Sequence, residues 1–261
     1  SVQGVLGGYI EMSIVDVALL NNLYEPSQVL FSPGMFNSVE ECDAILDGDW
    51  GAKFKADFER QTGIRILSLH CKGFRNFTTS NKELRRAADA KGVTFRVQES
   101  PVSIKMVEAL GAKAVPMPGS EMYVAMANGV VDGQENPVLN IIQDKTYEVQ
   151  KYLVLDGHMP GIMAYIINGE LYASPPDHLK TAVNEAADIA TPEAKKVVEN
   201  KNRDGIQILR NYGMSVYEPT AEEIEEWHST MFEPVQVYMR SILGEATVND
   251  LLNAIKARRG A

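Results

Sequence analysis

Apolar and polar residues alternate along several short segments of the chain, and this pattern predicts β-strands. One segment covers residues 10–17, a β-branched run covers 64–70, and shorter units cover 93–97 and 113–115. Between these segments the apolar residues recur at helical spacing. The expected helices open at Ser38 with a capping-box pattern and cover residues 103–110, 120–128, 222–243 and 248–258. This succession of strands and helices is typical of an α/β protein.

The longest helical pattern begins at Pro175-Pro176-Asp177 and runs towards Asn211. It contains the pair Thr191-Pro192, and a proline inside a helix removes a backbone hydrogen bond and clashes with the preceding turn. We therefore expect either a kink at this point or a restart of the helix with Thr191 as its cap.

Length and charge limit the function classes. A chain of 261 residues is long enough for one large core or two smaller ones. The formal net charge is −10 and the basic tail from Lys256 to Arg259 is short, so nucleic acid is not expected as a partner. An acidic protein that captures anions must concentrate its positive potential locally, at a cleft. No apolar run of the sequence reaches the about 20 residues needed to span a bilayer.

The two cysteines, Cys42 and Cys71, offer neither a disulfide framework nor metal-ligand spacing. We expect both to be free and structural, although an oxidising compartment would allow one bridge between them. No motif in the sequence indicates a cofactor or a metal site.

Two arginines and a polar turn are the candidate chemistry of the chain. A guanidinium matches a carboxylate with a rigid planar fork, whereas a lysine offers only a point charge. Arg75 follows the predicted strand at 64–70, and in open α/β sheets ligands gather outside such strand ends. Arg96 lies in the predicted strand at 93–97. Together with the Gln- and Asn-containing turn at 129–137, these arginines indicate a site for a small carboxylate.

Several short segments occur in an order and spacing that resemble one known family. They are residues 73–81 (GFRNFTTSN), 89–92 (DAKG), 95–101 (FRVQESP), 109–112 (ALGA), 115–123 (VPMPGSEMY), 130–137 (VVDGQENP) and 147–152 (YEVQKY), followed by His158. Together they resemble the solute-binding proteins of TRAP transporters, which are tripartite ATP-independent periplasmic systems. The resemblance covers nearly all of the chain, and many matches in one order are far more specific than a single short motif.

The resemblance implies a two-lobed, periplasmic-binding-protein-like α/β fold with one long helix spanning both lobes. The first lobe would comprise residues 1–72 and 162–201, and the second residues 73–161 and 202–261. Hinges are expected near Lys72-Gly73 and Pro160-Gly161. Family members open with a strand, a helix and a second strand that precede the first residues of this chain, so the first lobe is expected to lack its amino-terminal strands.

The resemblance assigns the two arginines different roles. Arg96 aligns with the family arginine that forms a paired salt bridge with the substrate carboxylate. Arg75 aligns with a second arginine, which either touches the ligand or braces the pocket.

Three further positions, Glu99, Gly119 and Asn136, fall at the implied cleft, and Phe74 and Tyr123 are additional candidates. Gly119 stands where phenylalanine or tryptophan commonly lines the pocket, which leaves room for a bulkier solute or for an aromatic side chain from elsewhere in the chain. Glu99 would accept from a ligand hydroxyl or amine, or neutralise an arginine. Asn136 precedes a proline suited to the first turn of a helix, so its amide either caps that helix or also faces the cleft. Phe74 and Tyr123 would pack against a ligand face or belong to the core.

These features predict an extracytoplasmic solute-binding protein that closes its lobes on an organic acid anion and delivers it to TRAP membrane subunits. It is expected to perform no chemistry, to be periplasmic and to act as a monomer. The sequence carries no signal segment, as in a mature or trimmed chain. The solute stays open among C4-dicarboxylates, sugar acids, keto acids and aromatic acids.

Two other functions stay open at this point. One is an enzyme acting on a small carboxylate, with His70, Cys71 or His158 as catalyst. His70 and Cys71 are adjacent in a predicted strand, so their side chains point to opposite faces, which disfavours them as a dyad. The other is a ligand-sensing protein that presents its liganded form to a receptor.

Overall fold

An eight-stranded mixed sheet is the centre of the computed structural model, which describes residues 2–260. Six strands follow the order β1-β7-β2-β5-β3-β4, while β6 pairs with β2 and with β8. Their bounds are β1 Met12–Asp16, β2 Ile64–Thr79, β3 Thr94–Val97, β4 Lys113–Pro116, β5 Gly133–Asn136, β6 Tyr152–Val154, β7 Met159–Asn168 and β8 Ser215–Tyr217. The strands predicted from alternation are thereby confirmed, and β3 runs parallel to both β4 and β5.

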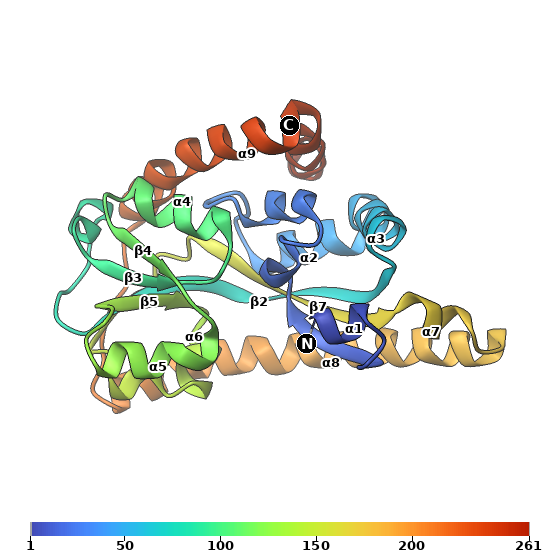
Figure 1. Cartoon of the computed structure of the whole chain (residues 1–261). Coiled ribbons are helices and arrows are strands. Elements are labelled where there is room, and N and C mark those ends of the chain that lie inside the picture. Colours follow the sequence, from blue (N-terminus) through green and yellow to red (C-terminus); the bar gives the residue numbers. More distant parts are fainter. Residues whose placement is uncertain (1, 261) are drawn as a thin grey trace.

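Helices cover both faces of the sheet (Figure 1). The long helix α8 (Asp177–Asn211) runs along one face, and α9 (Ala221–Arg259) lies over the opposite face. The remaining helices are α1 Val2–Leu6, α2 Val39–Asp47, α3 Asp49–Thr62, α4 Pro101–Ala109, α5 Gly119–Ala127, α6 Val138–Gln143 and α7 Gly169–Ala173, with 3-10 turns η1 Val17–Leu20, η2 Glu25–Phe31, η3 Ala87–Ala90 and η4 Thr146–Glu148. The predicted α/β architecture is confirmed.

The strand predicted at residues 64–70 continues without a break to Thr79. The prediction that Arg75 lies beyond a strand end is therefore wrong. The extension depends on a register shift between Cys71 and Phe74, where β2 has one more residue than the facing part of β7. Gly73 lies in this bulge with φ +102, a conformation that residues with a side chain rarely adopt.

The helix α8 passes through Pro192 without restarting, so the expected cap at Thr191 is not formed. The Thr191 hydroxyl instead lies 2.7 Å from the carbonyl oxygen of Ala187 and 2.6 Å from Oγ of Ser68 on β2. The contacts of Thr191 thus accompany a continuous helix α8 at a point where the local sequence favours an interruption. In α9 the predicted division into two segments is confirmed, because Gly244 has non-helical φ/ψ angles of 78° and 157°.

The two hinge candidates lie next to each other in space. Phe74 on β2 pairs with Pro160 on β7, directly beside the bulge at Gly73. A side chain at Gly161 would meet Lys72 and Pro137 at 2.9–3.1 Å, so the two strands approach closely here. Both strands between the predicted lobes therefore pass through one narrow region.

The C-terminal segment, predicted to belong to the second lobe, contacts helices assigned to the first lobe. Arg259 forms an ion pair with Glu41 on α2, and Asp250 forms one with Lys53 on α3. The tail of α9 thus reaches across to the first lobe, and the lobe boundaries stay a proposal.

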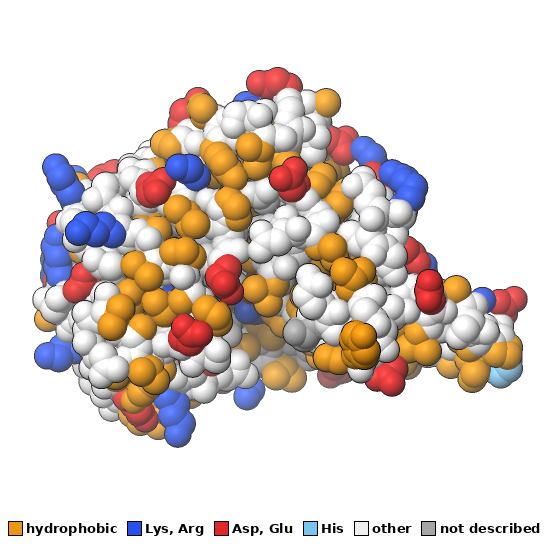
Figure 2. Space-filling view, viewed as in Figure 1, with side chains coloured by type: hydrophobic (Ala, Val, Ile, Leu, Met, Phe, Trp, Pro, Cys, Tyr) orange, Lys and Arg blue, Asp and Glu red, His pale blue; other side chains and the backbone are white. Residues whose placement is uncertain are grey.

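Figure 2 shows acidic and basic side chains interspersed over the viewed face. No helix within residues 2–260 combines the length and the apolar character needed to cross a membrane. Cys42 and Cys71 are buried and unbonded, as predicted.

Candidate functional site

The carboxyl ends of three parallel strands meet at one cavity of about 170 Å³. Gln98 and Glu99 follow β3, Met117 to Gly119 follow β4, and Asn136 ends β5. In open α/β sheets this edge is where ligands bind. The cavity is lined by Asp16, Leu19, Lys72, Arg96, Gln98, Glu99, Met117, Pro118, Gly119, Met122, Asn136, Asn140 and Asp144.

Arg96 is the central cation of this cavity. Its side chain is buried on β3, and its Nε and Nη2 donate to the Met117 carbonyl oxygen at 3.0 and 2.7 Å. Nη1 has only the Met122 sulfur, at 3.7 Å. Among residues 2–260 no carboxylate oxygen lies within 4.0 Å of the guanidinium. Burial lowers the pKa of Arg96, yet a guanidinium stays charged in proteins, so the cavity holds a buried cation without an anion.

Gly119 begins α5 directly beside this arginine. A side chain at Gly119 would come 3.8 Å from Nη2 of Arg96, which is ordinary van der Waals contact. The glycine has no positive φ angle, so its backbone does not require glycine. The first N–H groups of α5 also add positive potential next to the guanidinium.

The opposite wall consists of residues that the sequence analysis did not identify. Asp16 ends β1 and Lys72 lies on β2, where their side chains form an ion pair with Nζ 3.0 Å from Oδ2. Asn140 lies on α6, and Asp144 is the C-terminal cap of that helix. The signal available in the sequence was position alone, since Asp16 lies near the end of the strand predicted at residues 10–17 and Asn140 lies just after the turn that ends at Pro137.

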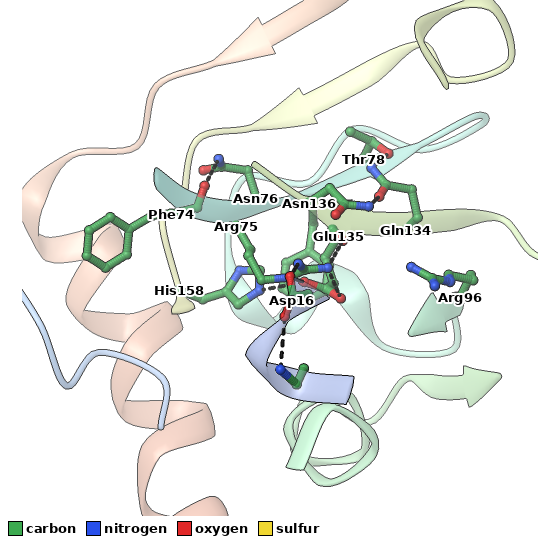
Figure 3. Close-up of polar contacts among 12 residues, drawn as sticks. Asp16, Phe74, Arg75, Asn76, Thr78, Arg96, Gln134, Glu135, Asn136 and His158 are labelled. Atoms are coloured by element: carbon green, nitrogen blue, oxygen red, sulfur yellow. Dashed lines mark hydrogen bonds and ion pairs between the residues drawn. The ribbon is translucent and has the colours of Figure 1, made fainter. Parts of the chain in front are cut away.

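Arg75 lies behind the cavity and not in its wall (Figure 3). Its side chain is 1% exposed, and its guanidinium forms an ion pair with Glu135 on β5. Nη2 donates at 2.9 Å to Oε1 and at 2.7 Å to the backbone carbonyl oxygen of Glu135, and Nε donates to Oε2. Asp16 is 3.9 Å from Nη1. Of the two roles implied for Arg75, this geometry favours bracing the pocket.

His158 completes the buried ionic cluster behind the cavity. Its Nδ1 lies 2.6 Å from Asp156, and its Nε2 lies 3.4 Å from Glu135, close enough for charge attraction but not aligned as a hydrogen bond. Burial alone would lower the pKa of His158, but the two carboxylates raise it to about 9. The ring is therefore a fixed cation at neutral pH and not a proton shuttle.

The residues proposed as catalysts lie outside the cavity that holds Arg96. His158 is fully buried in the ionic cluster, His70 packs edge-on against Tyr165, and Cys71 lines a different cavity. Within residues 2–260 no group of three or more His, Cys, Asp or Glu side chains could hold a metal ion. The arrangement can bind an anion, and none of the three residues named as possible catalysts lines the wall beside Arg96.

The other predicted site residues divide into two groups. Glu99 and Asn136 line the cavity with Arg96. The Asn136 amide donates to Gln134 at 2.6 Å, and Pro137 is the N-cap of α6, so capping by Asn136 is wrong. Phe74 lines a cavity next to α8, and Figure 3 shows it pointing away from Arg96. The Tyr123 hydroxyl donates to Glu148 at 2.7 Å outside the cavity wall.

Two larger cavities contain no comparable chemistry. One of about 410 Å³ lies between α3 and the end of α9, and one of about 340 Å³ lies between β2 and α8. Neither includes an arginine that is buried and lacks an anion. We therefore assign the site by the unpaired guanidinium and not by cavity size.

The family assignment comes from comparison with known proteins. The profile of the DctP family, described as bacterial extracellular solute-binding protein, family 7, matches residues 1–241. The chain therefore belongs to this family, which confirms the resemblance to TRAP solute-binding proteins. Members of the family are substrate-binding proteins of transport systems.

Two curated relatives illustrate this family. A solute-binding protein of Verminephrobacter eiseniae is 31% identical over 83% of this chain and 64% of its own length. The 2,3-diketo-L-gulonate-binding periplasmic protein YiaO of Escherichia coli is 29% identical over 79% of this chain and 63% of its own length. The chain thus spans somewhat less than two thirds of these relatives.

A solved structure supports the fold. The sugar acid binding protein DctPAm of Advenella mimigardefordensis, determined in complex with galactonate, is 29% identical and has a TM-score of 0.93. The match covers 98% of this chain and 82% of that protein. The α/β fold of a TRAP solute-binding protein is therefore shown for this chain.

Proposed function

We propose that the protein is the extracytoplasmic solute-binding component of a TRAP transporter and that it binds an organic acid anion. The observation that carries this proposal is the buried guanidinium of Arg96, which opens into the cavity with no carboxylate beside it. A buried charge is stable only when it is paired, so the solute carboxylate supplies the missing partner. The enzyme alternative is not favoured, because His70, Cys71 and His158, its proposed catalysts, do not line this cavity.

The relatives support the class of solute and the place of action. The E. coli and A. mimigardefordensis proteins bind organic acids, diketogulonate and galactonate, and the former is periplasmic. We infer the same compartment for this protein, with TRAP membrane subunits as its partners and the monomer as its binding unit. Asn136, Glu99 and Gly119 complete the proposed contact set around Arg96.

Closure of the two lobes is expected to follow binding. The hinge would lie where β2 and β7 pair beside Gly73, because both strands cross between the predicted lobes there. Hinge closure around a ligand is a known transition of periplasmic binding proteins. Addition of a saturating organic acid should therefore reduce the radius of gyration measured by small-angle X-ray scattering. A ligand shifts this equilibrium only if it binds the closed form more tightly.

The scattering test needs a binding control in the same samples. Isothermal titration calorimetry should show that the acid is bound at the concentration used. Identical scattering curves with and without a bound acid would contradict lobe closure and leave a preformed pocket.

The open position at Gly119 is expected to set the size of the solute. Gly119→Phe should remove the thermal stabilisation by sugar acids or aromatic acids seen with the wild type, because the ring would fill the space beside Arg96. Differential scanning fluorimetry with a panel of organic acids measures this effect. Gly119→Ala is the matched control and should keep the melting temperature of the unliganded protein, since no positive φ is required. If Gly119→Phe keeps its response to bulky acids, the size argument is wrong.

A further inference from the structure

A buried hydrogen bond joins segments that are assigned to different lobes. Nδ2 of Asn21, in the segment assigned to the first lobe, donates at 2.9 Å to Oγ of Ser100, in the segment assigned to the second lobe. The two residues are only 2% and 1% exposed. The bond is therefore shielded from bulk water, and breaking it inside the protein would leave a buried polar group without its partner.

This bond lies beside the cavity of Arg96 in the chain but is not part of its wall. Leu19, two residues before Asn21, lines the cavity, and so does Glu99, which directly precedes Ser100. Neither Asn21 nor Ser100 lines it. The pair can therefore affect solute binding through the position of the lobes, without touching the solute.

Ser100 does not use its hydroxyl to stabilise its own helix. It is the N-cap of α4, where a serine side chain usually accepts a hydrogen bond from a backbone N–H of the first turn. That capping bond is not formed here. The hydroxyl accepts from Asn21 instead, so its contact connects two parts of the chain that are far apart in sequence.

The amide of Asn21 is held in the orientation that this contact needs. Its Oδ1 accepts from the hydroxyl of Ser27 at 2.6 Å, and Ser27 is fully buried. Because the oxygen of the amide is occupied in this way, the NH₂ group faces Ser100. The donor is thus preoriented within its own segment, which limits the side-chain entropy lost when the bond forms.

We propose that Asn21 and Ser100 form a latch between the lobes that slows the release of the bound solute. The inference rests on the proposed function, in which the lobes close on an organic acid and must reopen to release it. Opening would separate η1 from α4 and expose both groups to water, so the bond exists only while the lobes are together. A contact made in the closed form alone shifts the equilibrium towards that form. Asn21 and Ser100 are then positioning residues that raise the affinity from outside the cavity.

The test is stopped-flow binding kinetics, followed by tryptophan fluorescence, on the wild type, Asn21→Ala, Ser100→Ala and the double variant. The probe is whichever of galactonate, erythronate, succinate and orotate binds the wild type most tightly in titration calorimetry. Each single substitution should raise the dissociation rate about three- to tenfold, as expected for one hydrogen bond, and leave the association rate unchanged. Calorimetry should show the same three- to tenfold rise in the dissociation constant. The double variant should lose no more than the more affected single variant, because both substitutions remove the same bond.

Two controls separate the latch from a general effect on the fold. Ser103→Ala changes another buried serine of α4 that lies outside this chain of bonds, and it should leave both rates unchanged. The unliganded Ser100→Ala protein should melt with the wild type in scanning fluorimetry, since the hydroxyl does not cap α4.

The outcomes separate this inference from the proposed function. Unchanged dissociation in both single variants would overturn the latch and leave the carboxylate site in place. Additive losses in the double variant, or a lower melting temperature of unliganded Ser100→Ala, would also overturn it, because the two residues would then support the general structure. If the wild type binds none of the four acids, the proposed function fails and this inference fails with it.

Discussion

Arg96→Ala is expected to abolish the rise in melting temperature that organic acids produce in the wild-type protein. The guanidinium is buried in the cavity, so its bond to a carboxylate would be largely shielded from water. Truncating one partner of such a charge pair costs about 2–5 kcal/mol of binding free energy. Calorimetric titration with the best-bound acid measures this loss directly, and fluorimetry reports the thermal shift.

A second substitution of Arg96 distinguishes the effect of its positive charge from the effect of its bidentate geometry. Arg96→Lys should recover little affinity, because a lysine cannot present two parallel donors to one carboxylate. The unliganded Arg96→Ala protein should melt close to the wild type, since the side chain bonds a carbonyl oxygen but no carboxylate. Arg203→Ala, on the exposed side of α8, is the control. Unchanged ligand-induced stabilisation in Arg96→Ala would contradict the central assignment.

Local patterns predicted the elements of this fold better than their extent. The alternation at residues 64–70 marked a strand, but β2 continues to Thr79 through a bulge at Gly73. The continuation depends on pairing with β7 and then with β5 and β6, and such partners are not visible in a window of residues. At Thr191-Pro192 the restart of the helix with Thr191 as cap is not formed, and Thr191 instead contacts Ser68 on β2, a partner that the local sequence does not show.

The resemblance, and not the strand-end argument, named four residues of the candidate cavity. Arg96, Glu99, Gly119 and Asn136 line one cavity because three parallel strands end at the same edge. Ligands do gather outside strand ends in open α/β sheets, but this argument was applied to Arg75, which lies within β2.

The opposite wall could not be predicted from local sequence. Asp16, Lys72 and Asn140 lie far apart in the chain and meet only through the crossing of β1, β2 and α6. Phe74 and Tyr123 were candidates for packing against a ligand face, yet Phe74 lines the cavity next to α8 and Tyr123 contacts Glu148. Side-chain direction is therefore the part of the site for which the structure is needed.

The buried cluster behind the cavity explains how Arg75 can matter without touching the solute. Arg75 joins β2 to β5 through Glu135, while Asp16 on β1 faces both Arg75 and Lys72. The cluster thus connects the strand that carries Asp16 in the cavity wall with the strand that ends in Asn136. A rigid support of this kind keeps the two walls of the site in a fixed position relative to each other.

Glu135→Gln is expected to lower the free energy of unfolding by about 3–5 kcal/mol, because it leaves the cations of Arg75 and His158 buried with a neutral amide. Burial alone would raise the pKa of Glu135, but the positive charges of Arg75 and His158 lower it to about 2. The carboxylate's contribution is therefore complete above its unfolded pKa of about 4.5 and is lost as the pH falls through about 2. Urea titration at pH 7 measures the full effect.

The matched control for this substitution is a carboxylate in an exposed ion pair. Glu108→Gln removes the partner of Lys105, which lies 2.8 Å away on the surface of α4, and should change the urea midpoint little because solvent screens the pair. Circular dichroism of both variants before titration establishes that they are folded. If Glu135→Gln shifts the midpoint no more than Glu108→Gln does, the buried cluster does not support the site in the way that its geometry indicates.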